Sequence, residues 1–374
     1  MASPQVLDFD QLLAPISPEA PAGTDLRSDA KTSQIYYAVK DARSAARAKE
    51  RSSLIEDGES RDSSTEWRPV FEQTQMLLSR QSKDLELTAW LIEAALRLHG
   101  FAGLRDGFLL ARKLVEQFWE GIYPRADDDG IETTVAPLSG LNGEDGEGTL
   151  IAPIRSRFIT GGQSVGPFAT WHYDQAIALE QVTDSNKRER RIADGAVTLQ
   201  QIKQAAAETT ATEFAALHAD LQEAQNEFQQ LAAVLDERCG PNSPPSSNIR
   251  NVLQSCDAAI VFLAGNKLGA TDNAEGTVGG YGPAGGAQVA ISSASGAPSI
   301  PGQIRNRGDA FKVLLDVAEF FRRTEPHSPL SYSLEQVVRW GKMPLPELLA
   351  DLINDRGARD EFFRVTGIPK QDQS

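Results

Sequence analysis

Residues with metal-binding and redox chemistry are scarce in this chain of 374 residues, which has two cysteines and four histidines. Cys239 and Cys256 form neither a CxxC pair nor a disulfide framework, so we expect free thiols in a reducing compartment. The histidines lack the H-E-x-x-H or clustered spacing that is typical of zinc sites. The sequence therefore predicts no metal site and no cofactor. The four histidines are His99, His172, His218 and His327.

Long apolar runs are also absent from the sequence. No stretch approaches the roughly eighteen apolar residues that a membrane-spanning helix needs. Residues 1–10 have neither the basic start nor the apolar core of a signal peptide. We therefore expect a cytoplasmic protein without membrane insertion.

Positive charge is in deficit, since 37 Lys and Arg residues against 52 Asp and Glu residues give a net charge of −15. This charge repels phosphate backbones, so we expect no general nucleic-acid binding, although a local basic patch is compatible with it. A hydrophobic content of 40% with 24% charged residues is typical of globular proteins. At about 150 residues per domain, the length corresponds to two or three domains.

The first part of the chain combines proline-rich and polar stretches. Pro15, Pro18 and Pro21 oppose a regular helix, so residues 9–27 are predicted to form an extended arm. Good helix formers predict a helix over residues 32–50. The polar, serine-rich residues 51–64 are predicted to be a mobile loop.

Three apolar patterns with helical spacing follow. Residues 67–78 have one apolar face and predict an amphipathic helix. Residues 85–98, with Asp84 as N-cap and Gly100 as stop, are apolar on every side, which is typical of a helix at the centre of a bundle. Residues 104–122 predict a third helix. The glycine-rich stretch that follows, over residues 125–165, has no readable period.

A second helical block is predicted from about residue 170. Apolar residues at steps of three and four from Phe214 to Leu235 give the strongest period in the chain. Prolines interrupt it, and a matching stripe over residues 249–263 predicts an antiparallel helical hairpin, with Cys256 as a small core residue.

The end of the chain differs in composition. Residues 265–302 are rich in glycine, alanine and serine, which is typical of a flexible linker. Helical periods resume over residues 309–324, 334–340, 345–353 and 358–365. We therefore predict an all-α protein with an N-terminal helical bundle (1–165), a middle helical hairpin (166–264), a flexible linker (265–305) and a small helical C-terminal domain (306–374).

One motif matches a hydrolase pattern. Residues 162–166 spell G-x-S-x-G, which in a nucleophile elbow presents a serine between a strand and a helix. Here Pro167 follows directly, no parallel-sheet pattern surrounds Ser164, and the base would have to be His172, His218 or His327. The pattern favours a glycine-rich connecting loop.

Two further motifs lack the context that their chemistry needs. Residues 280–285 spell G-x-G-x-x-G, but neither a strand nor a helix flanks them, and no P-loop motif occurs. Residues 127–130 resemble a calcium loop, yet its first and twelfth positions fall on Arg125 and Ala136, which carry no carboxylate. We therefore assign no cofactor to either motif.

Short motifs of apolar, proline and tryptophan residues punctuate the first 160 residues. Each motif alone is weak evidence of a protein family, but the whole set in this order is specific evidence. They are residues 12–17, 22–26, 67–71, 84–87, 90–91, 118–124 and 137–143.

In this order the motifs resemble the ImpA-type N-terminal domain of TssA proteins from bacterial type VI secretion systems. Residues 322–329, with Trp340 beyond them, also resemble TssA. The resemblance implies a protein without catalytic residues that forms rings through its C-terminal region and helps to assemble the contractile tail. It implies contacts with the tail tube, sheath, baseplate and envelope-complex proteins, and hence a place at the inner membrane. The sequence does not separate the baseplate branch of the family from the sheath-capping branch.

A flexible linker of about forty residues spans on the order of 35 Å, so N-terminal bundles could radiate from a central ring. Two alternatives compete with a ring: a serine hydrolase at Ser164, and a monomeric helical adaptor or chaperone that binds a partner through the stripe from Phe214 to Leu235. We expect the core or the subunit contacts of the C-terminal domain to use Phe320, Phe321, Leu334, Val338 and Trp340.

Overall fold

The computed structural model describes residues 2–28, 30–56, 64–128, 130–144, 146–268, 307–324, 330–343 and 348. The chain divides into two compact units, Met1–Gly280 and Tyr281–Ser374, and each is described by itself. Within the described residues there is no named strand, and only isolated β-bridges join extended segments. The prediction of an all-α fold is confirmed.

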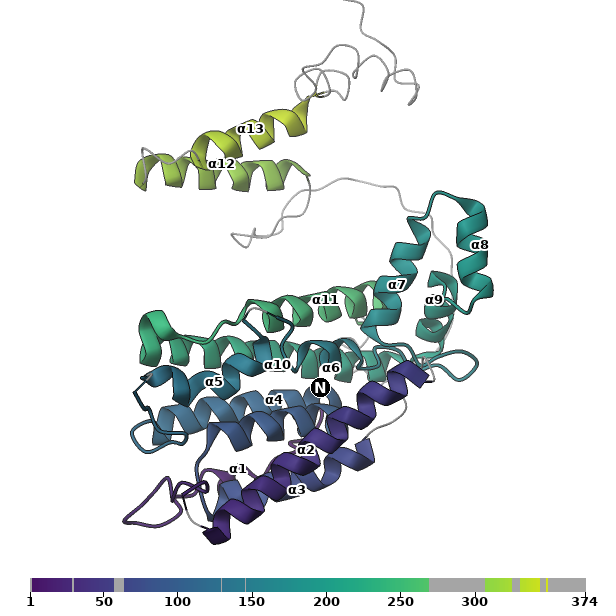
Figure 1. The fold of residues 1–374 in the computed structure, drawn as a ribbon. Helices are drawn as coiled ribbons and strands as arrows, with labels where there is room; N and C mark the ends of the chain where they lie inside the picture. The colour runs from purple at the N-terminus through teal and green to yellow at the C-terminus, as the bar shows by residue number, and fades with distance from the viewer. Residues whose placement is uncertain are drawn as a thin grey trace, which may run out of the picture. The chain divides into compact units, whose positions relative to one another are not determined.

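Helix α4 (Leu85–Phe118) forms the centre of the first unit. The Asp84 carboxylate caps it by accepting from the backbone N–H groups of Glu86 and Leu87, at 2.7 and 3.2 Å. Helix α3 (Ser64–Arg80) packs on one side of α4, and α10 (Ala211–Cys239) packs on the other (Figure 1). The expected bundle centre is therefore confirmed.

Gly100 interrupts this central helix as the sequence indicates. Its φ of 60° and ψ of −142° lie outside the helical region, so α4 is two helical segments joined at a kink. Glycine reaches such a positive φ without the steric cost that a side chain brings. The predicted stop at Gly100 is thus a change of direction, and the chain resumes a helix at once.

The predicted hairpin of the second block is also present. Helix α10 opens with a capping box in which Thr210 and Glu213 satisfy each other's backbone N–H groups, and it packs along α11 (Ser247–Ala264). The Phe108 and Phe228 rings lie 4.9 Å apart between α4 and α10. Cys256 is fully buried, as expected of a core residue.

Two predictions near the N-terminus need correction. The arm contains a short helix, α1 (Phe9–Leu12), with Asp8 as its N-cap. Helix α2 (Ala30–Glu56) extends through residues 51–56, where a mobile loop was expected, because a polar helix can continue without an apolar face. Of the other residues of that expected loop, 57–63 lie outside the described residues, and Ser64 is the first residue of α3.

The stretch without a readable period folds into α5 (Ile131–Asn142) and α6 (Ile151–Arg155). The side chain of Asn142 ties α5 to the start of α11, since its Oδ1 accepts from the Ile249 backbone N–H at 2.9 Å. Its backbone carbonyl accepts from the Asn248 side chain at 3.1 Å. Two amide contacts thus fix this region against the hairpin.

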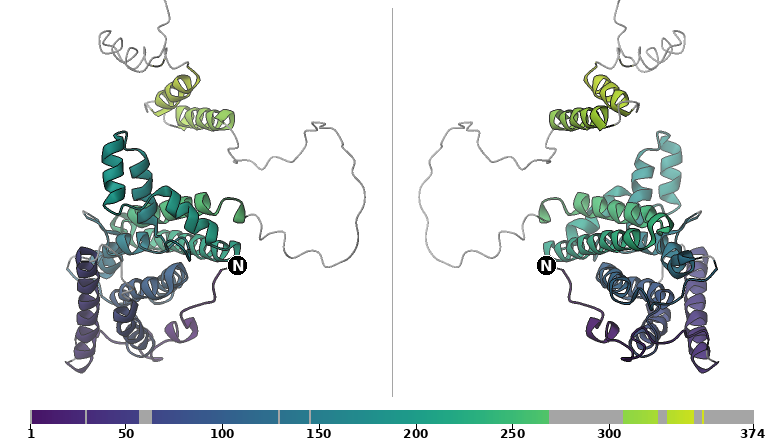
Figure 2. Two further views of the ribbon diagram at one scale, coloured as in Figure 1. Left: turned by 90° about the vertical axis from the view of Figure 1, so that its right-hand side faces the viewer. Right: turned by 90° about the vertical axis from the view of Figure 1, so that its left-hand side faces the viewer.

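Three shorter helices extend the first unit: α7 (Thr170–Glu180), α8 (Ser185–Ala193) and α9 (Leu199–Glu208). Helices α7 and α9 share a small core around Phe168, Ala176 and Ile202. Helix α8 buries no residue and stands out from the unit in both Figure 1 and Figure 2. Short 3-10 turns follow α10 and α11, at η1 (Gly240–Asn242) and η2 (Gly265–Lys267).

The second unit contains α12 (Arg307–Thr324) and α13 (Leu330–Lys342), which pack as a hairpin. Ala318 and Val338 are buried between them. The Phe311 ring lies against Gly341, where an added Cβ would approach ring atoms to 2.6 Å. The helix expected over residues 358–365 falls outside the described residues, and of the helix expected over residues 345–353 only residue 348 is described. The linker expected over residues 265–305 needs correction at its start, because residues 265–267 form η2 and Lys267 donates to the carbonyls of Ala206 and Thr209. Residues 269–305 of that linker lie outside the described residues. The boundaries at residues 165 and 305 stay predictions.

Candidate functional site

Ser164, the serine of the hydrolase-like motif, is part of a clasped loop. Its hydroxyl donates to the Glu208 carboxylate on α9, and the backbone N–H groups of Gln163 and Ser164 donate to the same carboxylate at 2.6 and 2.9 Å. These donors lower the pKa of Glu208 to about 2. Gly162 and Gly166 turn the loop with φ values of 102° and 87°. The carboxylate therefore holds a tight connection between α6 and α7.

His172 and His218, which were the described candidates for the base, contact residues other than Ser164. His172 Nδ1 accepts from the Ala169 backbone N–H at 3.0 Å, and its ring stacks on Trp171. His218 Nε2 lies 3.2 Å from the Asp257 carboxylate. His327 is outside the described residues. The contacts of Ser164 therefore favour the connecting loop over a nucleophile with its base.

The motifs at residues 22–26, 84–87 and 118–124 meet at one place in the first unit. The Lys83 backbone N–H donates to the Ala22 carbonyl at 2.7 Å. On the other side, the Tyr123 N–H donates to the Lys83 carbonyl at 2.9 Å, and the Leu85 N–H donates to the Tyr123 carbonyl at 2.7 Å. Segments that are far apart in the sequence are thus joined at the start of α4.

Charged side chains complete this junction. Arg27 donates to Asp84 at 2.8 Å and to Glu86 at 2.6 Å, and the Tyr36 hydroxyl donates to Glu86 at 2.6 Å. The fully buried Lys83 ammonium donates to the carbonyls of Leu12 and Leu78 at 2.7 and 2.8 Å. Burial lowers the pKa of Lys83 to about 8. The junction therefore has a structural role, because its polar groups bind one another.

A second cluster fastens the N-terminal arm to α4 and α10. Arg105 contacts Asp106 at 2.8 Å, Asp220 at 3.1 Å and the Ser3 carbonyl at 3.0 Å. Asp220 also accepts from the Ser3 backbone N–H at 2.7 Å. Because Arg105 and Asp106 lie on α4 while Asp220 lies on α10, the arm joins both helices.

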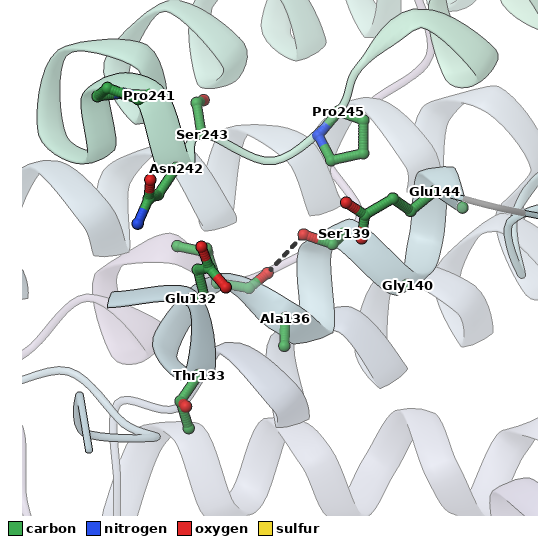
Figure 3. Close-up of a pocket in the computed structure, with 12 residues that line it drawn as sticks. Glu132, Thr133, Ala136, Ser139, Gly140, Glu144, Pro241, Asn242, Ser243 and Pro245 are labelled. Atoms are coloured by element: carbon green, nitrogen blue, oxygen red, sulfur yellow. Dashed lines mark hydrogen bonds between the residues drawn. The ribbon is translucent and has the colours of Figure 1, made fainter. Parts of the chain in front are cut away.

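A groove lies between α5 and the turn that follows α10 (Figure 3). Its volume is about 650 Å³. Glu132 and Glu144 line the groove and are exposed, and Figure 3 shows Ser139 between them and Asn242 across from Glu132. Its lining contains these two carboxylates and no basic residue, so the groove has a negative charge.

Helix α8 carries the opposite charge. Lys187, Arg190 and Arg191 are exposed and lie on one face, because residues three and four apart are neighbours on a helix. None of these three forms an ion pair within the described residues, whereas Arg188 pairs with Glu180 at 2.6 Å. Helix α8 is therefore a cationic surface on an acidic protein.

The stripe from Phe214 to Leu235 is buried against the rest of the first unit. Phe214 and Leu221 have no exposed surface, and Leu231 is 3% exposed. A partner helix could reach this stripe only if α10 separated from α4 or α11. The structure therefore disfavours the adaptor that would bind through it.

The expected C-terminal residues separate into two groups. Val338 is buried in the hairpin, whereas Phe320 is 52% exposed. Phe321, Leu334 and Trp340 are partly buried. Among the residues that the structure describes, no helix has both the length and the apolar content to cross a membrane, and no three metal-binding side chains gather.

The fold and its motifs match known proteins. Residues 13–143 match the family described as ImpA, N-terminal, type VI secretion system. The chain is 29% identical over 371 residues to the type VI secretion system component TssA1 of Pseudomonas aeruginosa, covering 96% of this chain and 98% of that protein.

A solved structure is also similar. It is the N-terminal domain, including the conserved ImpA_N region, of the TssA component from Burkholderia cenocepacia. The match has a TM-score of 0.58 and 26% identity, and it covers 70% of this chain and 95% of that chain. The family match coincides with the motifs that meet at the start of α4, whereas the groove and the cationic face of α8 were not predicted from the sequence.

Proposed function

We propose that this chain is a non-enzymatic, ring-forming assembly component of a type VI secretion system, because residues 13–143 match the ImpA N-terminal family and the chain is similar to TssA1. The similarity to TssA1 over 96% of the chain carries this proposal, because it includes both compact units. The ring would help to assemble the baseplate and the tail tube and sheath.

The second unit supplies the subunit contacts in this proposal. Val313, Val317 and Phe320 lie at steps of four and three on α12, and each is more than a third exposed. Tyr332 and Val337 on α13 are also exposed, at 64% and 46%. Apolar side chains in such a row are stabilised when a second surface covers them.

We assign the expected residues accordingly. Val338 belongs to the core between α12 and α13, where it is 3% exposed. Phe320 belongs to the contact between subunits, and the partly buried Phe321, Leu334 and Trp340 support it from within the hairpin. The N-terminal units engage the tail tube, sheath, baseplate and envelope-complex proteins on the cytoplasmic side of the inner membrane.

Substitution of the exposed row tests this proposal. In the full chain, Val317→Glu with Phe320→Glu places two charges at the contact and should reduce the ring to smaller species by mass photometry. Glu319→Gln, at an exposed position of the same helix, should leave the ring mass unchanged. Circular dichroism checks that each variant is folded.

Secretion provides the second measurement. The double variant should lose secretion in a strain that lacks the native gene, whereas Ser164→Ala should keep it. A wild-type chain that stays monomeric at micromolar concentration contradicts the ring, and loss of secretion by a folded Ser164→Ala favours the hydrolase.

A further inference from the structure

We propose that α8 of one copy docks in the groove between α5 and η1 of a neighbouring copy. The groove residues are Glu132, Ser139, Glu144, Asn242 and Ser243 together with their neighbours in the lining. This inference rests on the proposed ring, which keeps the first units of neighbouring copies close together.

The charges of the two surfaces are complementary. The groove lining contains the exposed residues Glu132 and Glu144 and no basic residue, and neither carboxylate forms an ion pair within the described part of the chain. Lys187, Arg190 and Arg191 are equally unpaired there and share one face of α8. Opposite charges across an interface steer association and fix its register.

The positions of the surfaces require two copies. In Figure 1, α5 and the end of α10 lie at one end of the first unit, and α8 lies at the other end. Because α8 and the groove lie at opposite ends of the same unit, α8 does not reach the groove of its own copy. A contact between different surfaces of identical chains is head-to-tail, and it closes when the chains form a ring.

Other anionic partners fit α8 less well. A membrane-surface helix needs a broad apolar face, but Ile192 is the one large apolar side chain of α8. A nucleic acid would meet Asp184, Glu189 and Asp194 among the cations, on a chain with a net charge of −15. An acidic protein surface suits this mixed pattern, and the chain itself provides one.

The contact between α8 and the groove can form in a ring even if it is weak. Exposed ion pairs contribute about 0.2 to 1 kcal/mol each, too little to join free units at micromolar concentration. Copies held in one ring experience an effective concentration of about millimolar, which favours weak contacts between neighbours. The contact should therefore form in the full-length ring and weaken with salt.

Zero-length crosslinking tests the contact in the full chain. Lys187 is the one lysine of α8, and a carbodiimide joins its amine directly to a carboxylate. In rings assembled from ordinary and heavy-nitrogen-labelled chains, we expect mixed-label peptides that link Lys187 to Glu132 or Glu144. Their yield should fall about fivefold or more in about 0.5 M salt.

Charge reversal tests the pairing. Glu132→Lys with Glu144→Lys should abolish these links, and Lys187→Glu with Arg190→Glu and Arg191→Glu should do the same. Combined in one chain, the reversed surfaces should again give mixed-label links between α8 and the groove. Glu19→Lys with Glu72→Lys changes the same charge at exposed positions elsewhere and should keep the original links.

The outcomes separate this inference from the proposed function. Mass photometry should give the same ring mass for all these variants, because the second unit holds the ring. A wild-type chain without rings overturns the proposed function. Rings without mixed-label Lys187 links, links within one chain only, or reversed surfaces that do not pair again overturn the docking of α8. Binding of anionic phospholipid vesicles that requires the α8 cations would also overturn it.

Discussion

Lys83 places an ammonium group in the interior of the first unit, between the carbonyls of Leu12 and Leu78. Water is excluded there, and the charged form is therefore less stable than in solution. The same group satisfies two carbonyls that would otherwise lack partners, which is costly in a protein interior. The residue thus joins α1 to α3 and makes stability depend on pH.

The pH dependence of stability should reveal this lysine. The folded pKa is about 8 and the ordinary value is 10.5, so between them the unfolded chain binds the extra proton. The free energy of unfolding should therefore rise with pH over this range, by up to about 1.4 kcal/mol per pH unit. Urea denaturation of the wild type and of Lys83→Met, from about pH 7.5 to 10, measures it.

The difference between these two proteins isolates the effect of Lys83. Burial raises the pKa of Cys256 to about 11 and also raises that of Tyr36, and both effects lower stability as pH increases. Both groups are present in the variant, so their contributions cancel in the difference. A wild-type-minus-variant difference that stays flat from pH 8 to 10 would contradict the prediction.

At the scale of elements, the pair α4 and α10 determines how the first unit is built. Phe108 on α4 and Phe228 on α10 bring their rings to 4.9 Å, and Leu221 is fully buried nearby on α10. The family match ends at residue 143, yet α10 packs directly on the central helix of the matched region. The matched region and the hairpin therefore share one core.

Truncation of Phe228 should destabilise this shared core. Phe228→Ala removes a buried ring and leaves a cavity, which costs about 3 kcal/mol because the residue is near the edge of the core. Chemical denaturation should show this loss, whereas Gln229→Ala at the next, exposed position should change stability by less than about 0.5 kcal/mol. Equal stability of the two variants would argue against the packing of α10 on α4.

The helices that sequence predicted well are those with a buried face. Residues 214–235 have an unbroken apolar period, and Asp84 is an N-cap that can be read directly before the apolar run of α4. Helix α8 has no apolar period because it buries nothing, and residues 51–56 extend a polar helix. Helix α5 was not predicted, because Pro137 and the nearby glycines are typical of loops.

The polar junction was not predictable for a different reason. Arg27 lies 57 residues from Asp84 and 59 from Glu86, and no local pattern connects charges at such separations. The resemblance identified the motifs, but the hydrogen bonds that join residues 22, 83 and 123 emerge only when the chain is folded. The groove likewise combines segments that are about a hundred residues apart.

At the scale of the whole molecule, the two units should behave independently. The first unit is compact up to the end of its described residues, where the Lys267 ammonium donates to the carbonyls of Ala206 and Thr209 at 2.8 and 2.6 Å. These bonds hold the end of α11 against α9. We therefore expect the first unit to fold without the second.

A chain that ends at Leu268 tests this independence. It should be monomeric, keep its helical circular dichroism and unfold in one cooperative transition, because α4 and α10 share a core. The full chain should show the same transition and a ring mass. An aggregated or largely unfolded truncated chain would indicate that the first unit needs the second.

The contacts of Ser3 with Arg105 and Asp220 have a practical consequence for imaging this protein in cells. Asp220 and Arg105 bind the backbone of the arm at Ser3, so this part of the arm is held against α4 and α10. A fluorescent reporter fused immediately before this point would have to fit beside α4 and α10. A polar spacer between the reporter and the arm would let the label report the position of the protein without separating the arm from α4 and α10.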